Sequence, residues 1–181
     1  MRKGPIGVLS IVGATLLNGA AWGQCEVAQI FSQGSFGRVS VSGNVAVISD
    51  TEAFGSLGAA FVYRRGPGGP GDWKLDAVLM APEPDVDDVF GFAVAVSGDV
   101  IVVGAPSAYI PKIQSGASYI YRFDPDISQW AYEATLTASG FESAYLFGFS
   151  VSIDGNVALI GARDAEIAGM YQAGSAYVFR Y

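Results

Sequence analysis

The dipeptide Phe-Gly occurs at Phe36-Gly37, Phe90-Gly91 and Phe147-Gly148, and each copy begins the same longer unit. The unit continues with alternating small and apolar residues, a Gly-Asn or Gly-Asp pair, a short apolar run and a variable loop. It closes on Gly-small-small-aromatic-aliphatic-aromatic-Arg. The Phe-Gly pairs lie 54 and 57 residues apart, and the closing glycines are 58 apart. A period of this size predicts an array of supersecondary units.

The second unit illustrates the local structure that each copy encodes. Its apolar runs, residues 92–96 and 101–103, flank the pair Gly98-Asp99. Two apolar runs around such a pair predict a β-hairpin, because glycine accepts the positive φ that a two-residue turn requires. Gly43-Asn44 and Gly155-Asn156 occupy the same place in the other copies. Both runs are apolar on both faces, which indicates strands covered on both sides.

The third strand of each unit carries two aromatic residues on one face, because strand side chains alternate with period two. These strands are residues 59–64, 117–122 and 175–180. The aromatic pairs could form a carbohydrate platform, but packing between neighbouring sheets is the favoured interpretation. The arginine that ends each strand is interpreted as a structural ion-pair or rim residue.

The fourth strand begins at a tryptophan and alternates polar with apolar residues, as an outer strand with one wet face would. Two copies are present, residues 73–79 and 130–136. The third unit stops at Tyr181, directly after its third strand. Residues 26–30 precede the first Phe-Gly pair much as residues 77–80 precede the second. We therefore expect residues 26–30 to complete the third sheet.

The N-terminus has the pattern of a secretory signal peptide over residues 1–23. Arg2 and Lys3 are followed by an apolar stretch over residues 6–17 and a small-x-small site at residues 21–23. A core helix or signal anchor is the alternative, although the stretch is shorter than the about 20 residues that span a bilayer. Cleavage predicts a chain of residues 24–181 that is secreted, extracellular, at the cell surface or periplasmic, with no membrane insertion.

Charge and composition narrow the function. Without Arg2 and Lys3, eight basic residues (10 − 2) face 17 acidic ones, a formal charge of −9. Such a balance argues against nucleic acid and anionic membranes as partners. The chain has no histidine, which removes Ser-His-Asp and Cys-His catalysis and the commonest zinc ligand. Its single cysteine excludes an internal disulfide framework.

These units resemble the FG-GAP repeat, the blade unit of the integrin α-subunit β-propeller and of many exported bacterial proteins. The Gly-Ala-Pro element is intact at residues 104–106, altered at 161–163 and lost at 48–50. The resemblance implies an all-β, propeller-like array of three four-stranded antiparallel blades, with the N-terminal strand completing the last. The repeats are expected at about 31–80, 81–137 and 138–181.

Two departures from the family pattern change what the resemblance implies. Calcium-binding members insert an Asp-rich loop between the first two strands, where this chain has only a two-residue turn. Calcium takes about six to eight oxygen ligands, so no calcium site is carried over. Propellers have about four to eight blades, and this chain encodes three. Either copies associate into a larger ring, such as six blades from two chains, or three blades close alone.

In a four-stranded meander, the long variable loops and the links between sheets emerge at one end, where integrin-like propellers bind ligands. Loops on a rigid scaffold commonly carry function. The acidic cluster on these loops could bind a metal, but solvated charge is favoured. The ligand-face candidates are Asp85, Asp87, Asp88, Tyr109, Tyr145, Arg163, Asp164 and Tyr171.

These observations predict a non-catalytic exported binding or adhesion module with a protein or carbohydrate ligand and no cofactor. A structural surface or envelope component that associates with itself, as a homo-oligomer, is the alternative. A third hypothesis is a glycan hydrolase using carboxylates such as Asp164 and Glu166, since glycosidases use two carboxylates about 5 to 10 Å apart.

Overall fold

The structure is a computed structural model that describes residues 37–109, 114–139, 145–166, 170 and 172–180. Within these residues the chain is all-β, with antiparallel sheets of four, four and three strands and no closed barrel. Sheet 1 contains β1 (Val39–Ser42), β2 (Val45–Asp50), β3 (Ala59–Arg65) and β4 (Trp73–Leu79). Sheet 2 contains β5 (Ala93–Ser97), β6 (Val100–Ala105), β7 (Ala117–Asp124) and β8 (Gln129–Leu136). Sheet 3 contains β9 (Phe147–Asp154), β10 (Val157–Ala162) and β11 (Ser175–Arg180).

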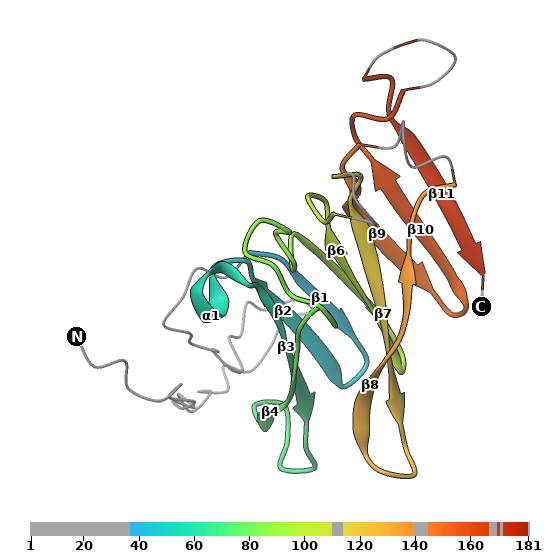
Figure 1. Cartoon of the computed structure of the whole chain (residues 1–181). Helices are drawn as coiled ribbons and strands as arrows, with labels where there is room; N and C mark the ends of the chain where they lie inside the picture. Colours follow the sequence, from blue (N-terminus) through green and yellow to red (C-terminus); the bar gives the residue numbers. More distant parts are fainter. Residues whose placement is uncertain (1–36, 110–113, 140–144, 167–169, 171, 181) are drawn as a thin grey trace, which may run out of the picture.

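The sheets follow one another along the chain, and sheet 2 lies between the other two (Figure 1). Each is a meander in which consecutive strands pair. The first strand of a following sheet packs on the first two strands of the preceding sheet, β5 on β1 and β2, and β9 on β5 and β6. The all-β class is therefore confirmed. Residues 26–30, expected to complete sheet 3, lie outside the described residues.

Sheets 1 and 2 share an apolar core, and the aromatic residues of β7 lie in it. Tyr119 and Tyr121 are buried on the face of sheet 2 that meets sheet 1. Their rings lie 5.6 and 6.4 Å from the ring of Phe90, at tilted and edge-on angles that aromatic pairs favour. The Tyr121 hydroxyl donates to the Met80 carbonyl at 2.6 Å. Packing between sheets, rather than a carbohydrate platform, is the role of this pair.

Two kinds of recurring glycine meet where one sheet joins the next. Gly116, before β7, has φ +84°, and a Cβ there would clash with the Phe147 carbonyl. Gly148 has φ +90°, and a Cβ there would clash with the Ala117 carbonyl. A parallel bridge joins Gly116 to Phe147, whose amide donates to the Ser115 carbonyl at 3.0 Å. The Phe-Gly pair and the glycine before the third strand therefore recur together because their backbones touch across the joint.

The long loops lie at one end of the molecule and the tight first turns at the other (Figure 1). Gly43, Gly98 and Gly155 have φ between +53° and +58°, as the expected two-residue turns require. The β2–β3 loop contains the short helical segment α1 (Ala53–Ser56), in which Phe54 and Gly55 have positive φ. The expected grouping of the variable loops at one end is thus present.

Arg64, near the end of β3, and Arg122, near the end of β7, are held by acidic partners on the neighbouring outer strand. Arg64 Nε donates to Asp76 Oδ2 at 3.0 Å, and Arg122 Nε donates to Glu133 Oε2 at 2.9 Å. The ion-pair interpretation is confirmed for these two residues. The outer strand β4 alternates exposed and half-buried residues, as expected, whereas β8 exposes three successive residues, Ala131, Tyr132 and Glu133.

Candidate binding site at the long-loop end

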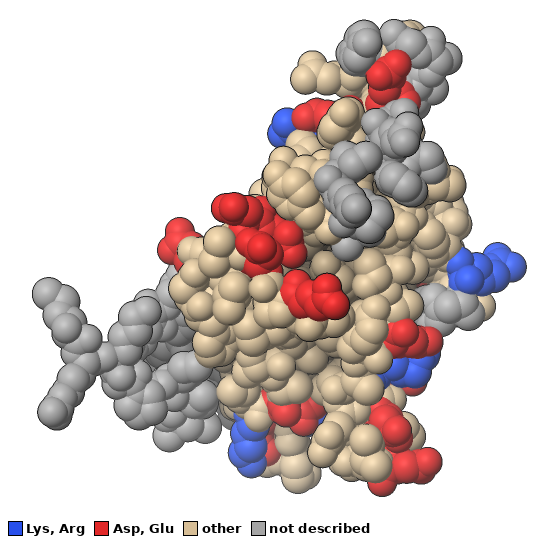
Figure 2. Space-filling view, in the orientation of Figure 1, with Lys and Arg blue, Asp and Glu red and all other residues tan. Residues whose placement is uncertain are grey.

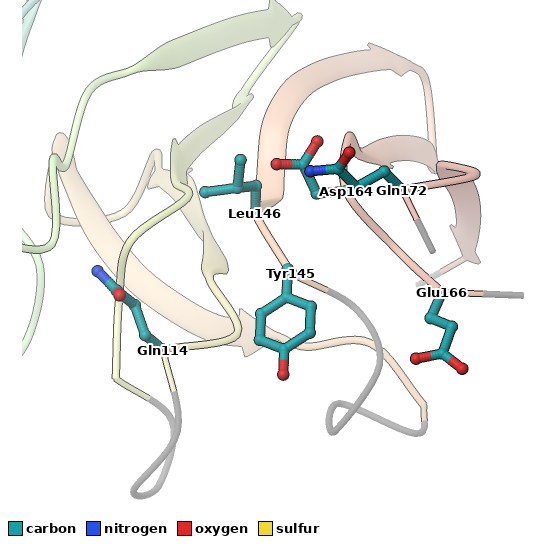
Figure 3. A pocket seen from close by; sticks show the side chains of 6 residues that line it. All are labelled: Gln114, Tyr145, Leu146, Asp164, Glu166 and Gln172. Carbon is teal, nitrogen blue, oxygen red and sulfur yellow. The ribbon is translucent and has the colours of Figure 1, made fainter. Parts of the chain in front are cut away.

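A cavity of about 430 Å³ lies at the long-loop end, between the loops of sheets 2 and 3. Figure 3 shows Tyr145 at its centre, with Gln114 on one side and Glu166 on the other. The β6–β7 loop, the β8–β9 connection and the β10–β11 loop contribute its walls. The described residues that line it are Gln114, Tyr145, Leu146, Asp164, Glu166 and Gln172.

Backbone contacts hold the walls of this cavity together. The Asp164 amide donates to the Tyr145 carbonyl at 3.4 Å. This bond joins the β10–β11 loop to the β8–β9 connection. Leu146 and Gln172 have φ of +60° and +56°, which is uncommon for residues with a side chain. The Phe149 amide closes the turn at Leu146 by donating to its carbonyl at 3.1 Å. The same turn recurs at Val89, whose carbonyl accepts from the Phe92 amide at 3.2 Å, so the conformation of Leu146 belongs to the repeat.

The charge of Asp164 is matched by its neighbour in sequence. Arg163 Nε and Nη2 donate to the two Asp164 carboxylate oxygens, each at 3.0 Å. This hydrogen-bonded pairing holds the pKa of Asp164 below its ordinary value. The Arg163 guanidinium also lies 4.8 Å from the centre of the Phe149 ring. The cavity therefore offers an exposed phenol, two amides and carboxylate acceptors beside a neutralised ion pair.

The structure brings some of the candidate residues together. Tyr145 and Asp164 line the cavity, and Arg163 is bound to Asp164. Tyr109 is exposed and forms an antiparallel bridge with Gln114 at the cavity wall. Tyr171 lies outside the described residues.

The acidic cluster lies elsewhere, on the connection between sheets 1 and 2. Asp85 and Asp87 are exposed, and the Asp87 amide donates to Asp85 Oδ1 at 3.3 Å. Asp88 is buried, so its interpretation as solvated loop charge is wrong. Burial raises the pKa of Asp88, although backbone hydrogen bonds from Tyr109 and Asp85 oppose that shift. Asp88 supports the loop from inside because its carbonyl also accepts from the Ser107 amide at 3.3 Å.

No group of three or more potential metal ligands gathers anywhere in the part of the chain that the structure describes. Figure 2 shows groups of acidic atoms over the loop end in this view, without a matching density of basic atoms. The loop end therefore presents acidic and polar groups to a ligand, which fits an uncharged or cationic partner better than an anionic one.

Sequence reasoning did not single out the two glutamines or Leu146. These residue types carry no motif, and only the meeting of three loops brings them together. It also missed a second hollow of about 540 Å³ along the first strands, which includes Arg38, Phe92 and Phe149. The centres of the Phe92 and Phe149 rings lie 4.8 Å apart with the rings tilted at 42°, and the Arg38 guanidinium lies 5.5 Å from the Phe92 ring centre. The sequence signal for this hollow is the position directly after each Phe-Gly pair, which is occupied by Arg38, Phe92 and Phe149.

The fold and its site define an array of repeated antiparallel sheets that displays a loop cavity at one end. The family model described as FG-GAP repeat matches residues 73–121 and 130–179, more than half of the chain. The chain belongs to the FG-GAP repeat family, as the resemblance indicated. Each match begins at the fourth strand of one sheet and ends in the third strand of the next. No curated protein matches the chain.

Among the described residues, no helix has the length and apolar character needed to span a bilayer.

Proposed function

We propose that this protein is an exported, non-catalytic binding module with a propeller-like arrangement of blades, and that its loop-end cavity binds carbohydrate. The observation that carries this proposal is the exposed Tyr145 between Gln114 and Glu166 in one cavity. Membership of the FG-GAP repeat family supports a role in ligand display or adhesion.

The chemistry of the cavity favours a sugar. The Tyr145 ring offers an apolar face to the C–H side of a pyranose, while amides both donate and accept hydrogen bonds from hydroxyl groups. Glu166 adds acceptors, and Asp164 is already engaged by Arg163. A volume of about 430 Å³ falls within the roughly 300–1,000 Å³ of small-ligand sites. A protein ligand would instead rest on the wider loop end.

The glycan hydrolase alternative has less support. A glycosidase needs one carboxyl group kept protonated to act as general acid. Asp164 is held ionised by Arg163, which lowers its pKa, so it does not fit the acid role. A Glu166→Gln variant checks this point, because measurable glycan turnover that disappears in the variant would favour the hydrolase.

The binding proposal is tested by screening the chain against an immobilised glycan array and titrating the best hit by calorimetry. We expect Tyr145→Ala to weaken that binding by at least about tenfold, or about 1.4 kcal/mol, since aromatic anchors dominate small interfaces. Tyr132→Ala is the matched control, because Tyr132 on β8 is 46% exposed against 47% for Tyr145 but lies away from the cavity.

Equal losses in the two tyrosine variants, or glycan binding unaffected by Tyr145→Ala, would contradict the assignment of the cavity. If the chain bound cell-surface proteins but no glycan, the proposed carbohydrate ligand would be wrong and a protein ligand would be indicated. Export is tested separately by mass spectrometry of the chain recovered outside the cytoplasm, with a new N-terminus expected at residue 24.

A further inference from the structure

The three sheets provide an internal comparison in which equivalent residues have different neighbours. Val39 and Val41 on β1 occupy the strand register that Val94 and Val96 occupy on β5. Val94 and Val96 are 8% and 6% exposed because sheet 1 covers them, whereas Val39 and Val41 are 73% and 67% exposed. We call this side of each sheet, which holds the first-strand valines and the aromatic pair, its leading face.

The opposite side of each sheet, its trailing face, shows the same contrast at the other end of the array. Leu159 pairs with Val178 in sheet 3 as Val102 pairs with Ile120 in sheet 2. Val102 and Ile120 are 0% and 2% exposed beneath sheet 3, but Leu159 and Val178 are 45% and 69% exposed. Among the residues that the structure describes, no further sheet lies against the leading face of sheet 1 or the trailing face of sheet 3.

These two open faces are complementary halves of one kind of interface. In the observed interfaces, a trailing face always meets the leading face of the next sheet. Most of that contact is made by the first strand of the following sheet, as with β9 on β5 and β6. The open part of the sheet 1 leading face is its first strand, because Phe61 and Tyr63 farther out are already buried. The exposed strand is thus the one that makes most of the contact in the other interfaces, where the aromatic pair of the third strand also takes part.

Hydrogen bonds between the first turns of successive sheets also support the docking of a further sheet on sheet 3. The Gly98 amide donates to Ser42 Oγ, and the Gly155 amide donates to Ser97 Oγ, each at 3.1 Å. In sheet 3 the residue before the turn glycine is Asp154, which is exposed. A further leading face docked on sheet 3 would bring its own turn glycine to the Asp154 carboxylate, a stronger acceptor than serine.

We propose that a second copy of this chain docks head to tail, with the leading face of its sheet 1 on the trailing face of sheet 3. Two copies of three sheets then close a ring of six, and each open face is used. Six blades lie within the roughly four to eight of known propellers. A head-to-tail contact that did not close would continue into a filament. This inference rests on the propeller-like arrangement proposed above and not on the ligand.

The test is the solution mass of the chain expressed from its full sequence, measured by light scattering and sedimentation equilibrium. We expect twice the mass of one chain. Val178→Glu should reduce the mass to that of one chain, because it places an unpaired charge in an apolar interface. Ile127→Glu is the matched control, since Ile127 is 59% exposed in the β7–β8 turn and should keep the double mass.

The direction of docking is tested from the other side of the interface. Val41→Glu should also give single chains, and a mixture of Val41→Glu with Val178→Glu should regain a dimer through its one intact interface. The affinity between the two chains of that dimer should be roughly tenfold or more lower than in the ring, because the second contact no longer acts intramolecularly. Circular dichroism should show the same fold in each variant.

A wild-type chain that stays single at all concentrations would overturn the proposal. So would a Val41→Glu variant that remains dimeric while Val178→Glu dissociates, since two trailing faces would then be pairing with each other. The glycan-binding test uses the Tyr145→Ala variant, whose substitution lies in the loop-end cavity and outside the proposed interface between copies. A failure of assembly and a failure of the proposed ligand binding are therefore distinguishable.

Discussion

The backbone joint between successive sheets depends on glycine for two separate reasons. Gly148 has positive φ, and a side chain there would also meet the Ala117 carbonyl. Gly98, in the first turn of sheet 2, has positive φ but open space around it. A comparison of alanine substitutions at the two glycines therefore separates two contributions to the free energy of unfolding. Gly98→Ala reports the left-handed conformation alone, and Gly148→Ala reports that conformation together with the steric clash.

We expect Gly148→Ala to destabilise the fold by about 3 kcal/mol or more and Gly98→Ala by about 1–2 kcal/mol, the cost of a left-handed alanine. Urea unfolding of both variants measures the difference as a shift of midpoint at constant slope. Equal shifts would show that sheets 2 and 3 move apart easily at this joint.

Asp88 is the residue whose charge the fold disfavours. Its pKa is raised from 3.8, first by burial and further by the nearby charges of Asp85 and Asp87. A raised pKa in the folded state means that protonation adds stability below pH 3.8, and that this contribution is lost as pH rises through the folded pKa.

Asp88→Asn keeps an acceptor but removes the charge. We expect the variant to be more stable than the wild type at neutral pH by about 0.5–1 kcal/mol and the advantage to vanish below pH 3.8. Thermal unfolding from pH 3 to pH 8 measures this. Asp87→Asn, at an exposed position, should stay within about 0.5 kcal/mol throughout. An advantage for Asp88→Asn that grows on acidification would contradict the assigned cause.

At the scale of elements, the outer strands of sheets 1 and 2 are tied through one carboxylate. Asp76 on β4 accepts from Arg64 Nε at 3.0 Å and from Trp130 Nε1 on β8 at 2.9 Å. The Arg64 guanidinium also lies 4.1 Å from the centre of the Phe123 ring. Trp73 occupies the corresponding place at the start of β4, but no described residue accepts from its indole N–H.

Trp130→Phe should therefore cost about 1 kcal/mol through the lost hydrogen bond to a charged group at a partly exposed site. Trp73→Phe, the same change at the equivalent position, should cost clearly less. Chemical denaturation of the two variants makes the comparison. Equal costs would show that the indole rings, rather than the link to Asp76, stabilise the outer strands.

At the scale of the whole molecule, the open faces of sheets 1 and 3 make stability depend on protein concentration. If a second copy covers Leu159 and Val178, association adds to the free energy of unfolding by mass action. The melting temperature of the wild type should then rise with concentration over a hundredfold range.

A Leu159→Arg variant should melt at one temperature across that range, because its dimer does not form. Differential scanning calorimetry at several concentrations records both curves. A wild-type melting temperature independent of concentration would argue that each chain is a complete folding unit by itself.

Most of the strands could be predicted because their signals are local. Trp73–Leu79 and Ser175–Arg180 have the bounds that alternation indicated. Asp88 was misread because it lies among charged loop residues in the sequence. Only the loop after β6, whose Ser107 amide bonds to the Asp88 carbonyl, makes its position internal. The cavity likewise combines glutamines from separate loops that have no pattern of their own.

The sequence by itself determined the repeat, the strand faces and the two-residue first turns, because each depends on residues close together in the chain or on a fixed period. Tertiary structure alone decided which equivalent residues are covered. Val39 and Val94 have the same side chain in the same register, yet one is exposed and the other buried. The reason is physical, since burial depends on whether another sheet lies against that face.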